Sequence, residues 1–221
     1  MQTPIGMSFV FRNLWVAPLA WVVLHSLDYY LTLWGAKLYH AGANQVVSFE
    51  GSYELNPHFQ KAIDQGQYFG PRFLISLGMI GILFAALMWL LGQDETAWPL
   101  TSQIGAGVLG VLLFTRLTVI GQHLQSVWLF HVILHHPETI RGHIVYDRPT
   151  VYRISFRRFM GTGVLLTAAA LLAPSAWIWG GALGHFFVGL SILRWSRRKL
   201  KARQVEEVSA VPALEDAETV M

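Results

Sequence analysis

Residues 14–38 read LWVAPLAWVVLHSLDYYLTLWGAKL, and this stretch decides the fold class of the chain. It is long and apolar enough to cross a hydrocarbon core of about 30 Å as a helix. Asp28 lies near its middle, where an ionised carboxylate is costly unless it faces a partner or water. The stretch therefore predicts a membrane-spanning helix that carries a candidate functional group.

The composition agrees with a protein of the lipid bilayer. Hydrophobic residues make up 53% of the 221 residues and charged residues only 13%, against roughly a quarter charged in soluble domains. The nine tryptophans are typical of helices anchored at membrane interfaces. The chain has no cysteine, which excludes disulfides, thiolate catalysis and cysteine-bound metals. The formal charge of +3 comes from local basic clusters, so the expected partner is the lipid bilayer and no nucleic acid.

Three more apolar segments follow, at residues 73–91, 104–134 and 159–193. The last contains Ala173-Pro174-Ser175 near its middle, which predicts a turn between two shorter helices. We therefore expect an all-α, polytopic transmembrane helix bundle of about five helices, the last two forming a short hairpin. Gly78 and Gly81 are expected to be close-packing points of the second helix.

Basic residues predict the orientation of these helices. Lys and Arg flank the last apolar segment, at 141, 148, 153, 157 and 158 before it and at 194, 197, 198, 199, 201 and 203 after it. Lys and Arg concentrate on the cytoplasmic side of a membrane, and a hairpin puts both clusters there. Residues 159–173 are short for a full span, so a re-entrant segment is the alternative.

The expected location is the inner cell membrane, with the N-terminus outside and the C-terminus in the cytoplasm. Residues 1–194 form the predicted transmembrane domain. Residues 195–221 are first basic and then acidic, and we expect them to form a disordered cytoplasmic tail.

A polar stripe follows one face of the first predicted helix. At about 100° per residue the stripe contains Trp21, His25, Asp28, Thr32, Gly35 and Tyr39. Polar side chains in a lipid setting face other helices, so the stripe is expected to point into the bundle. His25 and Thr32 either belong to a functional site or only satisfy Asp28 in a structural network, and the sequence leaves both open.

The third segment supplies a partner for Asp28. Arg116 is the only basic residue deep in any predicted span, and His123 follows seven residues later. An Arg and an Asp at similar depth lower each other's cost of burial. We expect an ion pair between the first and third helices, which either fixes helix register or lines a water-accessible cavity.

His131, His135 and His136 form the best candidate for a metal site. His131 and His135 share a helix face, so their imidazoles could chelate Zn or Fe. The HxxxHH pattern resembles one histidine box of membrane di-iron desaturases and hydroxylases, which need several such boxes. The other six histidines form none, and Pro137 follows directly, so an ordinary interfacial helix end is the alternative.

The first loop carries Glu54, Asn56 and Pro57. Asn56 is a good helix cap and Pro57 suits the first helical position, so a short interfacial helix from residue 57 to about 65 is predicted.

Two patterns, Asp28-x-x-x-Thr32 and Glu54-x-Asn56-Pro57, lie within residues 28–57. Together they resemble a small prokaryotic family of multi-pass membrane proteins known as a domain of unknown function. The resemblance implies that these five residues act as a unit, with Glu54 folded back toward the polar stripe. It implies no reaction.

These features favour a multi-pass membrane protein whose polar intramembrane site handles a proton, an ion or a small solute. One alternative is a membrane-embedded, metal-dependent enzyme that acts on a lipid-soluble substrate. Another is a structural or accessory subunit of a membrane complex. The small size of the chain favours a homo-oligomer or a partner membrane subunit.

Overall fold

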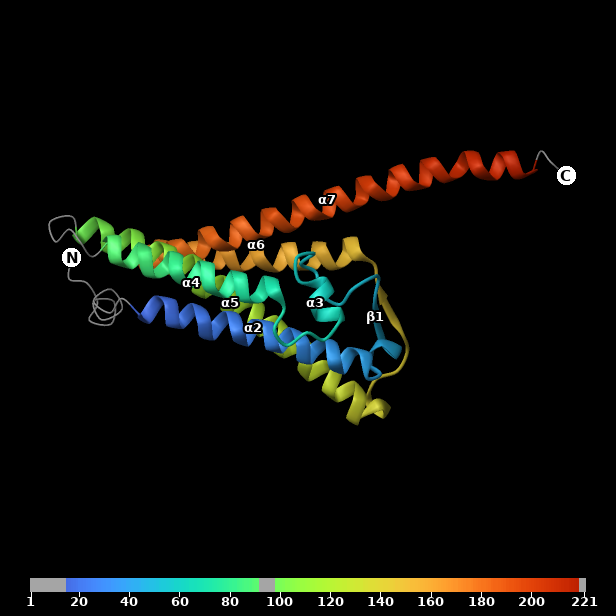
Figure 1. Cartoon of the computed structure of the whole chain (residues 1–221), viewed down its shortest axis with the longest axis horizontal. Helices are drawn as coiled ribbons and strands as arrows, with labels where there is room; N and C mark the ends of the chain where they lie inside the picture. Colours follow the sequence, from blue (N-terminus) through green and yellow to red (C-terminus); the bar gives the residue numbers. More distant parts are fainter. Residues whose placement is uncertain (1–14, 92–97, 219–221) are drawn as a thin grey trace.

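The computed structural model describes residues 15–91 and 98–218 of the chain (Figure 1). Its long helices are α2 (Val16–His40), α4 (Pro71–Leu91), α5 (Trp98–His135), α6 (Arg148–Leu172) and α7 (Ala176–Glu218). Four stretches are long and apolar enough to cross a membrane by length and composition: Val16–His40, Pro71–Leu90, Ser102–His135 and Ala176–Arg198. The protein is therefore an all-α helical bundle of the membrane class, as the sequence predicted.

Successive long helices run in alternate directions, so the connections gather at the two ends of the bundle (Figure 1). One end carries α3 (Gln60–Asp64), β1 (Val47–Phe49), β2 (Ile144–Tyr146) and the 3₁₀ turns η1 (Ala43–Gln45) and η2 (Pro137–Thr139). We call it the polar end. β1 and β2 pair in parallel, with Val47 opposite Ile144, and this pairing ties the loop after α2 to the loop after α5.

The predicted break at Pro174 is present. α6 ends at Leu172 and α7 begins at Ala176, and the two helices pack against each other along their apolar parts. They are longer than predicted, with 25 residues in α6 and 43 in α7, so the hairpin is not short.

The extra length of α6 lies at its start. The Asp147 side chain caps the helix by accepting a hydrogen bond from the N–H of Thr150 at 2.9 Å, and Pro149 lies in the first turn. α6 therefore begins at Arg148, and the arginines from 148 to 158 are helical rather than part of a loop.

The backbone of α7 stays helical to Glu218, where the composition of residues 195–221 predicted a disordered tail. Arg, Lys, Leu, Gln and Glu dominate residues 194–207, and all of them favour helix. No break in α7 marks the predicted boundary at residue 194. Residues 1–14 of the predicted transmembrane domain lie outside the described residues.

The prediction for the glycines of α4 was wrong. A Cβ added to Gly78 or Gly81 would meet nothing within 4 Å. Close packing instead joins α5 to α7, where a Cβ on Gly180 would overlap the backbone carbonyl of Gly107. Small residues let helix backbones approach, but only where a second helix faces them, and α4 turns these two glycines outward.

Candidate functional site

The polar stripe of α2 points into the bundle. Its side chains are almost fully covered: Trp21 is 3% exposed, His25 2%, Asp28 8%, Thr32 4% and Tyr39 6%. The helix thus turns its polar face to other helices and exposes apolar residues such as Val23 and Trp34.

Asp28 forms the predicted ion pair with Arg116 of α5. Nη1 of Arg116 donates a hydrogen bond to Oδ2 of Asp28. The guanidinium also lies over the Trp21 ring, with its carbon 4.8 Å from the ring centroid. The ring and the carboxylate together fix the cation between α2 and α5, which lowers the cost of holding two charges inside a bundle.

His123 approaches the same carboxylate from the next turns of α5. Its Nε2 lies 3.3 Å from Oδ1 of Asp28 and 3.0 Å from Oγ1 of Thr32. The Thr32 hydroxyl already donates to the backbone carbonyl of Asp28 at 2.8 Å, so its oxygen is free to accept from His123. This arrangement favours the tautomer of His123 that carries a proton on Nε2.

One oxygen of Asp28 is left without a hydrogen bond of good geometry. Oδ1 is buried, and within the described residues its close polar neighbour is Nε2 of His123. A buried carboxylate oxygen in this state gains from a proton, a water or a cation. The arrangement can therefore hold a mobile proton between a carboxylate and an imidazole.

His25 belongs to a different contact. Its Nε2 lies 2.7 Å from the Ser76 hydroxyl of α4, and that hydroxyl donates to the Phe73 carbonyl at 2.9 Å. The His25 ring stacks on Trp21 at 4.8 Å between centroids. His25 therefore links α2 to α4 and orients the tryptophan beneath Arg116, rather than contacting Asp28 directly.

Glu54 lies above the stripe in the loop at the polar end. Its Oε1 accepts a hydrogen bond from the Asn56 N–H at 2.6 Å, and its side chain is half-buried. Burial raises the pKa of Glu54 above its ordinary value, although the Asn56 N–H and the nearby His123 oppose this rise. Glu54 is thus a carboxyl group with a raised pKa within Coulombic range of His123 and Asp28.

Asn56 opens the following turn, as predicted, but the regular helix begins later. Its Oδ1 accepts from the His58 N–H at 3.0 Å, and its carbonyl accepts from the N–H groups of Phe59 and Gln60. The α-helix itself starts at Gln60, so Pro57 sits in a turn before the helix rather than in its first position.

Tyr53 is a site residue that the sequence reasoning missed. Its hydroxyl makes a side-chain hydrogen bond with Ser126, one turn beyond His123 on α5, and burial raises its pKa. The hydroxyl fits because the stripe residue at this level is Gly35, where a Cβ would lie 2.5 Å from it. Gly35 was the signal in the sequence, because a glycine within a polar stripe leaves room on the helix face for a side chain from another segment.

Arg148, which the sequence analysis used only for orientation, holds this loop in place. Its guanidinium donates to the backbone carbonyls of Ser52 and Glu54, the latter at 3.1 Å. The backbone N–H of Arg148 donates to the Glu50 carboxylate at 3.3 Å, and the Tyr152 ring lies beneath the Arg148 guanidinium. The first residue of α6 thus fastens the Glu54 loop over the site.

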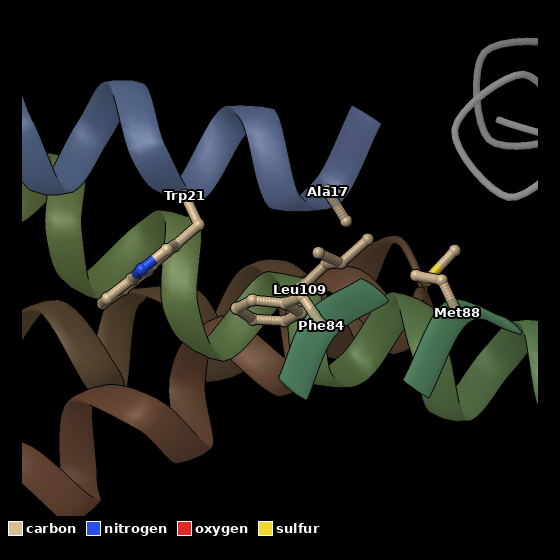
Figure 2. Close-up of a cluster of buried hydrophobic side chains, with 5 residues drawn as sticks. All are labelled: Ala17, Trp21, Phe84, Met88 and Leu109. Atoms are coloured by element: carbon tan, nitrogen blue, oxygen red, sulfur yellow. The ribbon is translucent and has the colours of Figure 1, made fainter. Parts of the chain in front are cut away.

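Apolar side chains fill the bundle on the other side of the ion pair. Figure 2 shows this cluster, drawn from α2, α4 and α5: Ala17, Trp21, Phe84, Met88 and Leu109. A small cavity of about 10 Å³ is lined by Arg116 and by four of these residues, Ala17, Trp21, Phe84 and Leu109, and it is no larger than a single water. Among the described residues the Asp28–Arg116 pair is therefore bordered by apolar side chains toward this end and by the loop that carries Glu54 toward the other end.

The proposed metal ligands do not form a cluster. His131 and His135 are exposed and stack on each other at 4.0 Å, and Nδ1 of His135 lies 2.9 Å from the carbonyl of His131. Within residues 15–91 and 98–218, no group of three or more His, Cys, Asp or Glu side chains could hold a metal ion. The two histidines share a helix face, as predicted, but the described residues supply no third ligand for Zn or Fe.

His185 of α7 is fully buried. Its Nδ1 donates to the carbonyl of Gly181 at 2.7 Å, which leaves Nε2 to accept from the Thr118 hydroxyl at 2.8 Å. This histidine joins α7 to α5 as a neutral group.

No family model matches the chain, and no curated protein or solved structure matches it either. The family resemblance at residues 28–57 therefore stays a prediction. What can be said of function rests on the geometry of Asp28, Arg116, His123 and the Glu54 loop.

Proposed function

We propose that this helical membrane protein carries a proton-transfer site made of Asp28, His123 and Glu54, with Arg116 as the fixed counter-charge. The observation that carries the proposal is the contact between the buried Oδ1 of Asp28 and Nε2 of His123, 3.3 Å apart and without another hydrogen-bond partner for Oδ1 among the described residues. Imidazole is the side chain that changes charge most readily near neutral pH.

Charge balance explains why four groups are present. Asp28 and Arg116 neutralise each other, so a proton that arrives on His123 adds one positive charge to a buried site. An ionised Glu54 nearby offsets that charge, and burial favours its return to the neutral form. A proton that moves from Glu54 to His123 therefore leaves the net charge of the site unchanged.

The direction of access follows from the distribution of polar groups. Glu54, Tyr53 and Arg148 cover the site at the polar end, whereas the apolar cluster of Figure 2 fills the other end. Arginines of α6 and α7 concentrate at the polar end, which supports its assignment to the cytoplasm of a cell whose inner membrane holds the protein. The helices then place the N-terminus outside and the C-terminus inside.

The proposal is tested by proton movement in vesicles that contain the purified protein. A pH-sensitive dye trapped in the vesicles reports acidification after a pH step, with a potassium ionophore to dissipate charge. Asp28→Asn and His123→Gln should each abolish the protein-dependent rate. Glu138→Gln, which removes an exposed carboxylate outside the site, should leave it unchanged. Equal rates in the original protein and in folded Asp28→Asn contradict the proposal and favour a structural role for the ion pair.

A further inference from the structure

Five arginines gather where α6 and α7 reach the polar end: Arg157, Arg158, Arg194, Arg197 and Arg198. We call this set the arginine patch. All five side chains are exposed, and in the part of the chain that the structure describes none of them forms an ion pair. Arg153 is left out of the set because it lies within Coulombic range of the Asp147 carboxylate, whose pKa is lowered first by its hydrogen bonds with Thr150 and then by Arg153.

The patch continues a lipid-facing surface. At about 100° per residue, Arg157 and Arg158 fall on the face of α6 that exposes Leu165 and Leu172. In a membrane bundle, apolar side chains that no other helix covers face the lipid tails. The arginines of α6 therefore extend from the surface that meets lipid.

α7 repeats the arrangement. Arg194 and Arg198 lie on the helix face that exposes Leu183, Phe187 and Leu190. Both helices of the hairpin thus present an apolar stripe that ends in arginine at the polar end.

The depth of the patch follows from helix length. Residues 159–173 of α6 separate the arginines from the turn at Pro174, and 15 residues span only about 22 Å at 1.5 Å per residue. The hydrocarbon core is about 30 Å thick. If the turn at Pro174 lies at one face of the bilayer, Arg157 and Arg158 lie no further out than the headgroup layer of the opposite face. Their long side chains then extend outward to the lipid phosphates of that layer.

The packing of the hairpin places the two groups of arginines at one height. A Cβ on Gly163 of α6 would lie 2.9 Å from the Phe186 ring of α7, and Phe159 packs with Ile192. Because the helices are antiparallel, moving two residues from the Phe159–Ile192 contact toward the polar end brings Arg157 level with Arg194. The charges of both helices thus face the same layer of the bilayer.

We propose that the arginine patch binds the phosphate headgroups of anionic phospholipids in the leaflet at the polar end. Guanidinium groups bind phosphate oxygens through paired hydrogen bonds, and an anionic headgroup supplies the charge that the described residues lack. The acyl chains of the same lipid lie along the apolar stripes that lead to the patch. The proposal does not depend on the proton-transfer site.

Native mass spectrometry of the detergent-solubilised full chain tests this with phosphatidylglycerol as the probe and phosphatidylcholine as the neutral comparison. The patch variant is Arg157→Gln, Arg158→Gln and Arg194→Gln combined. Its matched control, Lys37→Gln, Lys61→Gln and Arg141→Gln, removes the same charge from exposed positions elsewhere at this end. We expect the patch variant to bind phosphatidylglycerol at least about tenfold more weakly than the original protein, and the control to lose much less.

Three results overturn the proposal. Equal losses in the patch variant and its control show that net charge alone attracts the lipid. Equal binding of phosphatidylcholine and phosphatidylglycerol to the original protein shows that the headgroup charge is not recognised. Displacement of phosphatidylglycerol by millimolar inorganic phosphate shows a site for free phosphate. Circular dichroism of each variant confirms that the helices are retained, so that lost binding is not lost folding.

Discussion

Replacing Arg116 with methionine removes the cation that pairs with Asp28 but keeps an unbranched apolar side chain in its place. Asp28 is only 8% exposed, so its charge is left with the His123 contact at 3.3 Å. Removing one partner of a buried pair costs about 3–5 kcal/mol in the free energy of unfolding. The lost contact between the guanidinium and the Trp21 ring adds about 0.5–2 kcal/mol.

The reverse substitution, Asp28→Asn, is expected to cost less. The Arg116 side chain is 26% exposed, and it keeps the Trp21 ring beneath its guanidinium. The double variant leaves no unpaired charge, so it should be more stable than Arg116→Met alone by at least about 2 kcal/mol.

Thermal unfolding in detergent, followed by tryptophan fluorescence, measures these differences. For a chain of this size 1 kcal/mol corresponds to about 2–4 °C in the unfolding midpoint. The ion-pair loss in Arg116→Met should therefore lower the midpoint by roughly 6–20 °C. A double variant that unfolds at a lower temperature than either single variant refutes the pairing argument.

Three further comparisons test other contacts by the same unfolding measurement. Gly180→Ala should lower the free energy of unfolding by about 1–3 kcal/mol, because the added Cβ meets the backbone of α5. The control, Gly78→Ala, should not destabilise the protein, and equal effects of the two substitutions would be inconsistent with the α5–α7 contact. Glu54 has a raised pKa, so its stabilising contribution is complete below its ordinary value of 4.5 and is lost as pH rises through the folded-state value. Glu54→Gln should remove this loss, and an unchanged pH profile would count against the buried position of Glu54. Gly35→Ala should displace the Tyr53 hydroxyl, and adding Tyr53→Phe should recover part of the stability; no recovery would rule out that contact.

The spans were predictable because apolar length is a local property of the sequence. The Asp28–Arg116 pair was predictable for a related reason: two opposite charges deep in apolar segments have few partners other than each other. The burial of the whole stripe from Trp21 to Tyr39 followed from helix periodicity alone.

Contacts between segments far apart in the sequence were not predictable in this way. Arg148 reaches carbonyls 94 and 96 residues away, and His25 pairs with Ser76, 51 residues away, because of how the helices pack. The glycine error has the same origin, since local sequence does not tell which helix face meets a neighbour. The sequence does contain a signal for the start of α6 that the prediction did not use, because Asp147 followed by Pro149 is an ordinary capping pattern.

Single-cysteine labelling tests most directly whether the Asp28 site is reached from the polar end, and the chain suits it because it contains no native cysteine. Thr32→Cys places a thiol beside His123. A small charged thiosulfonate is added outside vesicles in which the protein is inserted with either its polar end or its opposite end facing outward. We predict labelling from the polar end only, faster when Arg148→Gln loosens the Glu54 loop, and no labelling of Leu109→Cys in the apolar cluster. Labelling of Thr32→Cys from the opposite end, or from neither end with Arg148→Gln present, would contradict the account.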